Sequence, residues 1–306
     1  MSRIFEALQR ADLERKIALD PEAFQIVEPE NIPFSETTEQ VKSPAILVDE
    51  IARRRWSPSL TSLPTLADRG AGVEQFRGLR TRIYQLRNEA PIKTILVSSG
   101  MPGEGKTFVA ANLAMSLARN TAANVLLIDG DLRRPTLHNL LGAPNKPGLS
   151  EYLAGTAELK DILQRDLNEE TLDRGGESRI ANLTFIPAGA GGDDSSEAVS
   201  NPRMEALIVA LAPHFNCIVI DSPPVLAVTD AVDLARVADG VLLVARGAST
   251  PFDVAQRAQA AFSHSRILGF VVNAVKGVPR NASYSYYYGE EEDGGRSNRA
   301  NKQRRQ

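Results

Sequence analysis

The sequence predicts a doubly wound α/β fold, in which helices cover both faces of a mostly parallel β-sheet. Short β-rich apolar runs alternate with helical patterns from about residue 73 to residue 273, which is typical of this fold class. The runs are apolar throughout and do not alternate with polar residues, as expected of strands that are covered on both faces. With 306 residues, the chain is long enough to bury a substantial core.

The expected strands are six apolar runs, at residues 94–98, 125–129, 183–187, 217–221, 241–245 and 268–273. Helical patterns lie between them, including those at 107–119, 202–212 and 251–263. In the last of these, Thr250 is placed to act as the N-cap and Pro251 to occupy the first helical position. The carboxyl ends of such strands line the crevice where ligands bind in open α/β sheets.

Residues 1–70 differ from the rest, because prolines interrupt every candidate helix there except the first. We expect an N-terminal segment and linker over 1–70, a compact domain over 71–278, and a flexible tail over 279–306. Ile4, Leu8 and Ala11 fall on one helical face, so residues 2–16 could form a short amphipathic helix. That helix is either a frayed terminus or a docking helix for a partner.

Composition limits the classes of function. The net charge of -3 gives no argument for nucleic-acid binding as the main activity, and the only cysteine, Cys217, allows no internal disulfide. No apolar run approaches the roughly 20 residues that span a bilayer. The N-terminus lacks the apolar stretch of a secretory signal. We therefore expect a cytoplasmic protein, whose membrane role would come through a partner.

The strongest motif is a glycine-rich loop between an expected strand and an expected helix. The sequence GMPGEGKT at residues 100–107 matches G-x-x-x-x-G-K-[ST], and this context is the one that confirms a P-loop. Its glycines let backbone N–H groups turn inward around phosphate oxygens. Lys106 should reach the β and γ phosphates, and the Thr107 hydroxyl should bind Mg2+. The sequence predicts an ATP site whose contacts include Gly100, Gly103, Glu104, Gly105, Lys106 and Thr107.

Aspartates follow two further expected strands. Asp129 and Asp131 lie at the end of VLLIDGD, and Asp221 ends CIVID. Because the carboxyl ends of parallel strands share one edge, these three side chains should converge on the metal and the γ-phosphate. A lone Asp at a strand end is usually a turn residue, but three of them beside a P-loop favour a shared site. Asp221 is interpreted as the Walker-B aspartate.

These motifs together resemble the bacterial tyrosine autokinases of capsule and exopolysaccharide synthesis, which are cytoplasmic P-loop kinases. SSGMPGEGKT is similar to the family's Walker A motif, VLLIDGDLRRP to its Walker A′ and IVIDSPP to its Walker B. GLSEYLAG at 148–155 is also similar to family sequence. The residues Glu74, Arg77 and Arg80 fit the E-x-x-R-x-x-R pattern of the family's subunit-contact helix. The C-terminal tyrosine cluster is matched by Tyr284, Tyr286, Tyr287 and Tyr288.

The resemblance implies an ATP-dependent protein-tyrosine autokinase that phosphorylates its tyrosine cluster on a neighbouring subunit and regulates polysaccharide synthesis or export. It implies a homo-oligomer, for which a ring is one candidate form, and a transmembrane polysaccharide co-polymerase that recruits the chain to the inner face of the membrane. Lys106, Asp129 and Asp131 are the expected catalytic residues, with Asp129 orienting or deprotonating the acceptor tyrosine. Thr107, Asp129 and Asp221 are the expected metal ligands.

Several alternatives stay open at this point. A partition or cell-division ATPase that acts as a nucleotide-dependent switch is the main rival, although Met101 stands where those proteins carry an extra lysine. A non-enzymatic adaptor is a second rival. Asn273 either contacts adenine, as in related sheets, or simply ends a strand. Arg133 either stabilises charge or pairs with an aspartate. The charges from Glu74 to Arg80 could also form an ordinary solvated face, and the tyrosine cluster a low-complexity tail.

Two departures from the family pattern are visible. GGDDSSEAVSNPRM replaces a proline-rich stretch that is common in these kinases, so this loop differs locally from the family pattern. The clustered tyrosines do not close the chain, because further residues follow Tyr288. We expect this extension to be harmless in a flexible tail.

Overall fold

The computed structural model describes residues 51–59, 61–67, 69–119, 123–167, 182–192 and 199–275. All of them belong to one compact unit of the chain, Ser43–Gln306. The proposed N-terminal helix at 2–16 and the tyrosine cluster lie outside the described residues. Within the described ranges, no helix combines the length and the apolar content that crossing a membrane requires.

The described residues form an eight-stranded sheet with the strand order β1-β4-β5-β3-β6-β2-β7-β8. The six strands from β5 to β8 in this order run parallel to one another, whereas β4 (Gln164–Asp166) pairs antiparallel with β5 and β1 pairs parallel with β4. The mostly parallel sheet confirms the predicted fold class. The strands that the sequence predicted are β2 (Thr94–Ser99), β3 (Val125–Asp129), β5 (Leu183–Ile186), β6 (Cys217–Asp221), β7 (Gly240–Arg246) and β8 (Ile267–Asn273).

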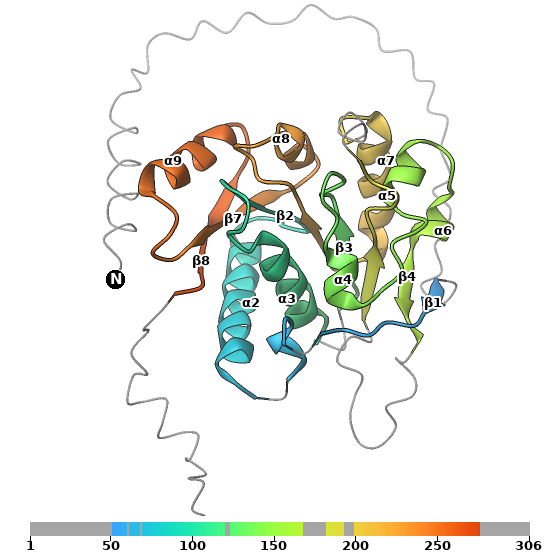
Figure 1. Cartoon of the computed structure of the whole chain (residues 1–306), viewed down its shortest axis with the longest axis horizontal. Coiled ribbons are helices and arrows are strands. Elements are labelled where there is room, and N and C mark those ends of the chain that lie inside the picture. The colour runs from blue at the N-terminus through green and yellow to red at the C-terminus, as the bar shows by residue number, and fades with distance from the viewer. Residues whose placement is uncertain are drawn as a thin grey trace, which may run out of the picture. The chain divides into compact units, whose positions relative to one another are not determined.

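Helices cover both faces of this sheet (Figure 1). Alternate residues of a strand point to opposite faces, so Leu127 packs into one hydrophobic layer and Leu126 and Ile128 pack into the other. The first layer contains α2 (Ala71–Glu89), α3 (Lys106–Ala118) and α4 (Leu137–Leu141). The second contains α5 (Leu149–Leu153), α6 (Leu159–Ile162), α7 (Pro202–Leu211), α8 (Asp230–Ala235) and α9 (Phe252–Ala261).

The expectation of a linker up to residue 70 is wrong for the described residues from 51 to 67. This segment contains β1 (Ala52–Arg54) and a 3-10 helix, Pro64–Leu66, and it packs into the fold. Trp56 is only 2% exposed, and its ring meets Phe185 edge-on with 6.1 Å between ring centroids. Prolines prevent long helices, but they do not prevent an extended segment from burying aromatic surface against a sheet. The packed domain therefore begins before residue 71.

The expected N-cap of α9 is also wrong by one residue. Pro251 occupies the N-cap position and Phe252 begins the helix. The Thr250 hydroxyl does not cap the helix, because it accepts a hydrogen bond from the Arg246 N–H (2.8 Å) and contacts Glu104 of the glycine-rich loop.

The GLSEYLAG segment has a structural role around Glu151. Its carboxylate accepts hydrogen bonds from the N–H groups of Gly148 (2.8 Å) and Ala190 (2.9 Å), which ties α5 to the loop that follows β5. Burial favours the neutral form of Glu151, but these backbone N–H groups outweigh it and hold the pKa below its ordinary value. The same loop also contacts the segment after β3 that resembles the Walker A′ motif. There the Gly192 N–H donates to the Leu132 carbonyl (3.0 Å).

Candidate functional site

The glycine-rich loop connects β2 to the first residue of α3. Gly103 and Gly105 have φ angles of +82° and +96°, which lie in the left-handed region that favours glycine. A Cβ atom on Gly105 would also lie 2.0 Å from Asn273 Nδ2, so a side chain at this position would displace Asn273. The loop leads into the N-terminus of α3, a helix of 13 residues. The N-terminus of a helix attracts anions.

Lys106 is the first residue of α3 and points to the strand ends. Its Nζ lies 2.9 Å from Asp131 Oδ2 and donates to the Thr107 hydroxyl at 3.3 Å. Burial lowers the pKa of Lys106, but the charges of Asp221, Asp131 and Asp129 outweigh it, so that the net pKa is raised. Lys106 is therefore a partly buried ammonium group whose charged form is stabilised by the neighbouring carboxylates.

Asp129 and Asp221 lie side by side at the ends of neighbouring strands. Their Cα atoms are register partners between β3 and β6, and both residues are completely buried. Asp129 accepts hydrogen bonds from the N–H groups of Leu137 (3.1 Å) and Asp131 (3.3 Å). Neither carboxylate oxygen of Asp221 accepts a hydrogen bond in the described part of the chain. The structure thus brings the three predicted aspartates together with Lys106.

The carboxylates of this cluster repel one another. Burial and the charges of Asp221 and Asp131 raise the pKa of Asp129 well above its ordinary value. Burial raises the pKa of Asp221 to about 6, against the opposing charge of Lys106. The Thr107 hydroxyl lies near enough to lower the Asp221 pKa, although not in hydrogen-bonding geometry. Three carboxylates facing one ammonium group leave an excess of negative charge that a cation would stabilise.

The oxygen-rich cluster suits Mg2+ better than a transition metal. Within the described ranges, no set of three or more His, Cys, Asp or Glu side chains is arranged to hold a metal ion by itself. This agrees with the usual mode of Mg2+ binding, in which one or two carboxylates act together with waters and substrate phosphates. The unpartnered, buried carboxylate of Asp221 is the feature that best fits such an ion.

Comparison with known proteins identifies the family. A family model described as the CobQ/CobB/MinD/ParA nucleotide binding domain matches residues 95–297. A Staphylococcus aureus protein named "Putative tyrosine-protein kinase CapB" is 31% identical over 220 residues, which cover 71% of this chain and 90% of the relative. The chain belongs to this family of bacterial tyrosine-protein kinases, and it contains a nucleotide-binding domain.

Solved structures of this kinase family have the same fold. The kinase domain of the Escherichia coli tyrosine kinase Etk matches with a TM-score of 0.63 and 30% identity, covering 73% of this chain and 83% of that domain. A second tyrosine kinase, YwqD of Bacillus subtilis, is 33% identical over 216 residues, which cover 70% of this chain and 85% of the relative. These relatives are named as tyrosine kinases, which supports the predicted class of enzyme over the partition ATPase.

The candidate site also includes residues that the motifs did not indicate. The Arg246 guanidinium donates to the Gly103 carbonyl (3.0 Å), and Thr250 contacts the Glu104 carboxylate. Arg246 ends β7 in the same way that Asn273 ends β8, so a search of every strand end could have found it. The Asn273 amide donates to the Glu104 carbonyl (3.0 Å), which places Asn273 against the phosphate loop. Its contact with adenine remains a prediction.

The remaining predicted charges have partners within the fold. Arg133 forms a two-pronged ion pair with Asp230, in which Nε lies 2.9 Å from Oδ2 and Nη2 lies 3.3 Å from Oδ1. On α2, Arg77 pairs with Glu74 at 3.0 Å. Arg80 instead donates to the Ser116 carbonyl of α3 (2.6 Å), so part of its charge is used within the subunit.

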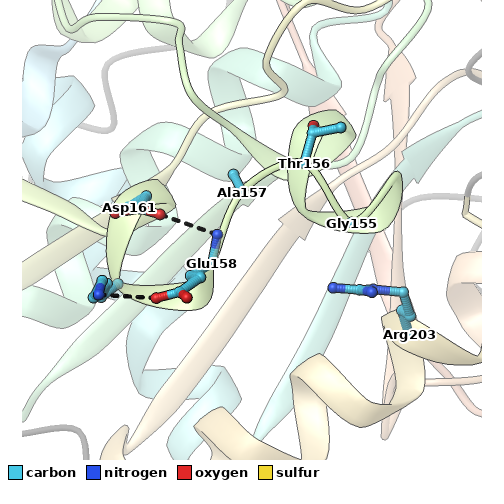
Figure 2. A pocket seen from close by; sticks show the side chains of 7 residues that line it. Gly155, Thr156, Ala157, Glu158, Asp161 and Arg203 are labelled. Atoms are coloured by element: carbon cyan, nitrogen blue, oxygen red, sulfur yellow. Dashed lines mark hydrogen bonds and ion pairs between the residues drawn. The ribbon is translucent and has the colours of Figure 1, made fainter.

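A surface pocket of about 570 Å³ lies apart from this site (Figure 2). It is lined by the 155–161 segment and by Arg203, and its charged side chains are of both signs. Arg203 stacks over the Tyr152 ring at 4.9 Å, and Lys160 pairs with Glu158 at 2.8 Å. None of the lining residues belongs to the phosphate loop or to the aspartate cluster.

Proposed function

We propose that this tyrosine kinase transfers the γ-phosphoryl group of Mg2+-ATP to its own clustered tyrosines, Tyr284, Tyr286, Tyr287 and Tyr288. The observation that carries the proposal is the convergence of Lys106 with Asp129, Asp131 and Asp221 behind a phosphate loop. The four groups come from α3, β3, β6 and the turn after β3. A phosphoryl-transfer site needs such a combination of positioned cation, metal ligands and proton acceptor.

Lys106 is the proposed phosphate ligand. Its ammonium group is held toward the strand ends by Asp131 at 2.9 Å, and phosphate oxygens would compete with that carboxylate for the same donor. The backbone N–H groups of the loop and the N-terminus of α3 would bind the remaining phosphate oxygens. We therefore place ATP contacts at Gly100, Gly103, Glu104, Gly105, Lys106 and Thr107, with Asn273 close to this loop.

The proposed Mg2+ ligands are Thr107, Asp129 and Asp221, directly or through water. When bound, Mg2+ would neutralise charge on the β and γ phosphates. Asp221 supports this assignment because its buried oxygens have no hydrogen-bond partner in the described residues. Asp129 is more constrained, since two backbone N–H groups already donate to its carboxylate. These contacts fix the orientation of Asp129 without using all of its acceptor capacity.

Asp129 is also the proposed proton acceptor. Burial and the charges of Asp221 and Asp131 raise its pKa, which makes this carboxylate a stronger proton acceptor than an ordinary one. In the transfer, the tyrosine hydroxyl oxygen forms a bond to the γ-phosphorus, the bond to the β-phosphate oxygen breaks, and the hydroxyl proton passes to the carboxylate. Asp131 would assist by holding Lys106 and, through its other oxygen, the Arg134 N–H (3.1 Å).

Assembly and location complete the proposal. The family resemblance implies that the chain acts as a homo-oligomer in which Glu74, Arg77 and Arg80 contact a neighbour. It also implies that a transmembrane polysaccharide co-polymerase recruits the kinase to the inner face of the membrane. The kinase domain and the tail are proposed to divide near residue 278, with the domain extended at its N-terminus to include the packed segment from residue 51. Polysaccharide synthesis or export is the proposed regulated process.

Incubation with labelled ATP and Mg2+ tests this function and separates its rivals. Phosphotyrosine on the protein supports the autokinase. Release of free phosphate without phosphotyrosine would support a nucleotide-dependent switch, and the absence of both would support an adaptor. Mass spectrometry then locates the modified residues, which should be the four clustered tyrosines.

A further inference from the structure

The phosphate loop contains a buried carboxylate that bonds to the loop backbone and to a residue outside the loop. Glu104 lies within the loop, yet it is only 4% exposed, and its side chain does not join the aspartate cluster. Its Oε2 accepts a hydrogen bond from the Met101 N–H at 2.7 Å, which closes the loop upon itself. Its Oε1 contacts the Thr250 hydroxyl. Burying a carboxylate costs free energy unless its oxygens accept hydrogen bonds. These two contacts therefore restrict the conformation of the loop.

Thr250 connects this carboxylate to the end of β7. The Arg246 N–H donates to the Thr250 hydroxyl oxygen at 2.8 Å. Because an ionised carboxylate can only accept hydrogen bonds, the Thr250 hydroxyl donates its proton to Glu104. Hydrogen bonds to an ionised acceptor are about twice as strong as those between neutral groups. The hydrogen bond between Thr250 and Glu104 joins two residues that are 146 positions apart in the sequence.

Two side chains at the ends of β7 and β8 also donate hydrogen bonds to the loop. The Arg246 guanidinium donates to the Gly103 carbonyl at 3.0 Å, and the Asn273 amide donates to the Glu104 carbonyl at 3.0 Å. Both contacts satisfy carbonyl groups on the loop. A peptide group whose carbonyl is held in this way cannot rotate freely, so its neighbouring N–H groups keep their directions.

We propose that Thr250 is a positioning residue for nucleotide binding, which acts through Glu104 to fix the phosphate loop. Thr250 lies outside the sequence motif, and the Glu104 carboxylate is engaged by Met101 and Thr250, so the proposed ATP contact of Glu104 is made by its backbone N–H. The proposal rests on the proposed function only in requiring that the loop binds ATP. Its physical basis is preorganisation, because a loop that is already fixed loses less conformational freedom when phosphate binds.

The decisive comparison is between Thr250→Val and Thr250→Ser. Valine keeps the shape of threonine but removes the hydroxyl, whereas serine keeps the hydroxyl. Thr250→Val should raise the Kd for Mg2+-ATP and for ADP by about tenfold, as expected when one hydrogen bond to a charged group is lost. Thr250→Ser should stay within about threefold of the parent, because the donor to Glu104 is retained. In autophosphorylation, Thr250→Val should raise KM more than it lowers kcat.

The matched control is Thr81→Val on the exposed face of α2, where the hydroxyl donates only to the Arg77 carbonyl (3.0 Å). Both valine variants remove one threonine hydroxyl, and only the variant at residue 250 should weaken nucleotide binding. Thr250→Val should also melt at a lower temperature than Thr81→Val, because it leaves the buried Glu104 carboxylate without one partner, and nucleotide affinity is compared at a temperature where both variants are folded. If Thr250→Val fails to fold, Glu104→Gln replaces it in the same assays, since the amide keeps the size of the side chain but removes its charge.

A double-mutant cycle identifies the path of the effect. If Thr250 acts through Glu104, Thr250→Val should add little to the loss of affinity caused by Glu104→Ala. Additive losses in the double variant would overturn the proposed link, and so would parent-like affinity in Thr250→Val. If the parent protein itself binds no nucleotide, the proposed function fails and takes this inference with it. If the parent binds and Thr250→Val binds equally well, only the inference fails.

Discussion

Trp56→Ala tests whether the kinase domain begins before residue 71. Trp56 is 2% exposed, its ring packs edge-on against Phe185, and its indole N–H donates to Gln164 Oε1 at 3.2 Å. Truncation of a buried tryptophan costs about 3–5 kcal/mol. We expect a loss near 4 kcal/mol in the free energy of unfolding, because Gln164 also loses its partner. For a domain of this size, that loss lowers the melting temperature by roughly 8–16 °C.

The assay is urea unfolding followed by circular dichroism, since the chain has one tryptophan and the variant has no tryptophan fluorescence. Trp56→Phe should lose only about 1–2 kcal/mol, because it keeps an aromatic ring and loses the indole donor. Val209→Ala is the surface control; Val209 is 65% exposed, and its truncation should change the stability by less than about 0.5 kcal/mol. If Trp56→Ala unfolds at the same urea concentration as the parent, the segment around Trp56 is a linker after all.

The other predictions concern charge, acceptor sites and assembly. The pKa of Asp221 is raised to about 6 from an ordinary value of 3.8. The folded protein therefore binds more protons than the unfolded chain between these values, and its stability falls as the pH rises through them. Asp221→Asn should weaken this trend, to which the raised pKa of Asp129 also contributes, stabilise the nucleotide-free protein at pH 8 by on the order of 1–3 kcal/mol and abolish Mg2+-dependent phosphorylation; thermal melts from pH 4 to 8 that match the parent would contradict this account. Replacement of the four clustered tyrosines by Phe should remove most phosphate incorporation and leave the Kd for ATP unchanged. Labelling that persists at Tyr84, whose hydroxyl is buried, would contradict the assignment of the clustered tyrosines as acceptors. Glu74→Ala/Arg77→Ala should shift an oligomer toward monomer in light scattering, and Arg80 is left intact because it also bonds to the Ser116 carbonyl; unchanged mass would leave the pair as a solvated ion pair of little energetic value.

The buried strands were predictable because their sequences are apolar from end to end. The Val125–Asp129 and Cys217–Asp221 strands have the bounds that the apolar runs indicated. The phosphate loop was predictable because its sequence motif is local and lies between a strand and a helix. The convergence of Asp129 with Asp221 followed from one topological rule about the ends of parallel strands.

The edge of the sheet could not be predicted in this way. The Gln164–Asp166 strand is short and polar, yet it is buried, because Trp56 supplies its partners through the indole and the backbone N–H. Such partners are remote in sequence, and a polar run by itself indicates an exposed turn. The contact between Glu104 and Thr250 was hidden for the same reason, since it joins residues 146 positions apart. Thr250 was assigned to the nearest helix as a cap because only local partners are visible in a sequence.

The central claim is that Lys106 and the aspartate cluster transfer phosphate from ATP to the clustered tyrosines. Its most direct test is mass spectrometry of the parent, Lys106→Met and Lys160→Met after incubation with Mg2+ and ATP. Lys160 is a suitable control lysine, because its side chain is 77% exposed and its only ion pair, among the described residues, is with Glu158 on the surface. The account predicts phosphate on Tyr284–Tyr288 in the parent and in Lys160→Met, and none in a folded Lys106→Met protein. Phosphotyrosine in Lys106→Met at the parent's level would contradict it.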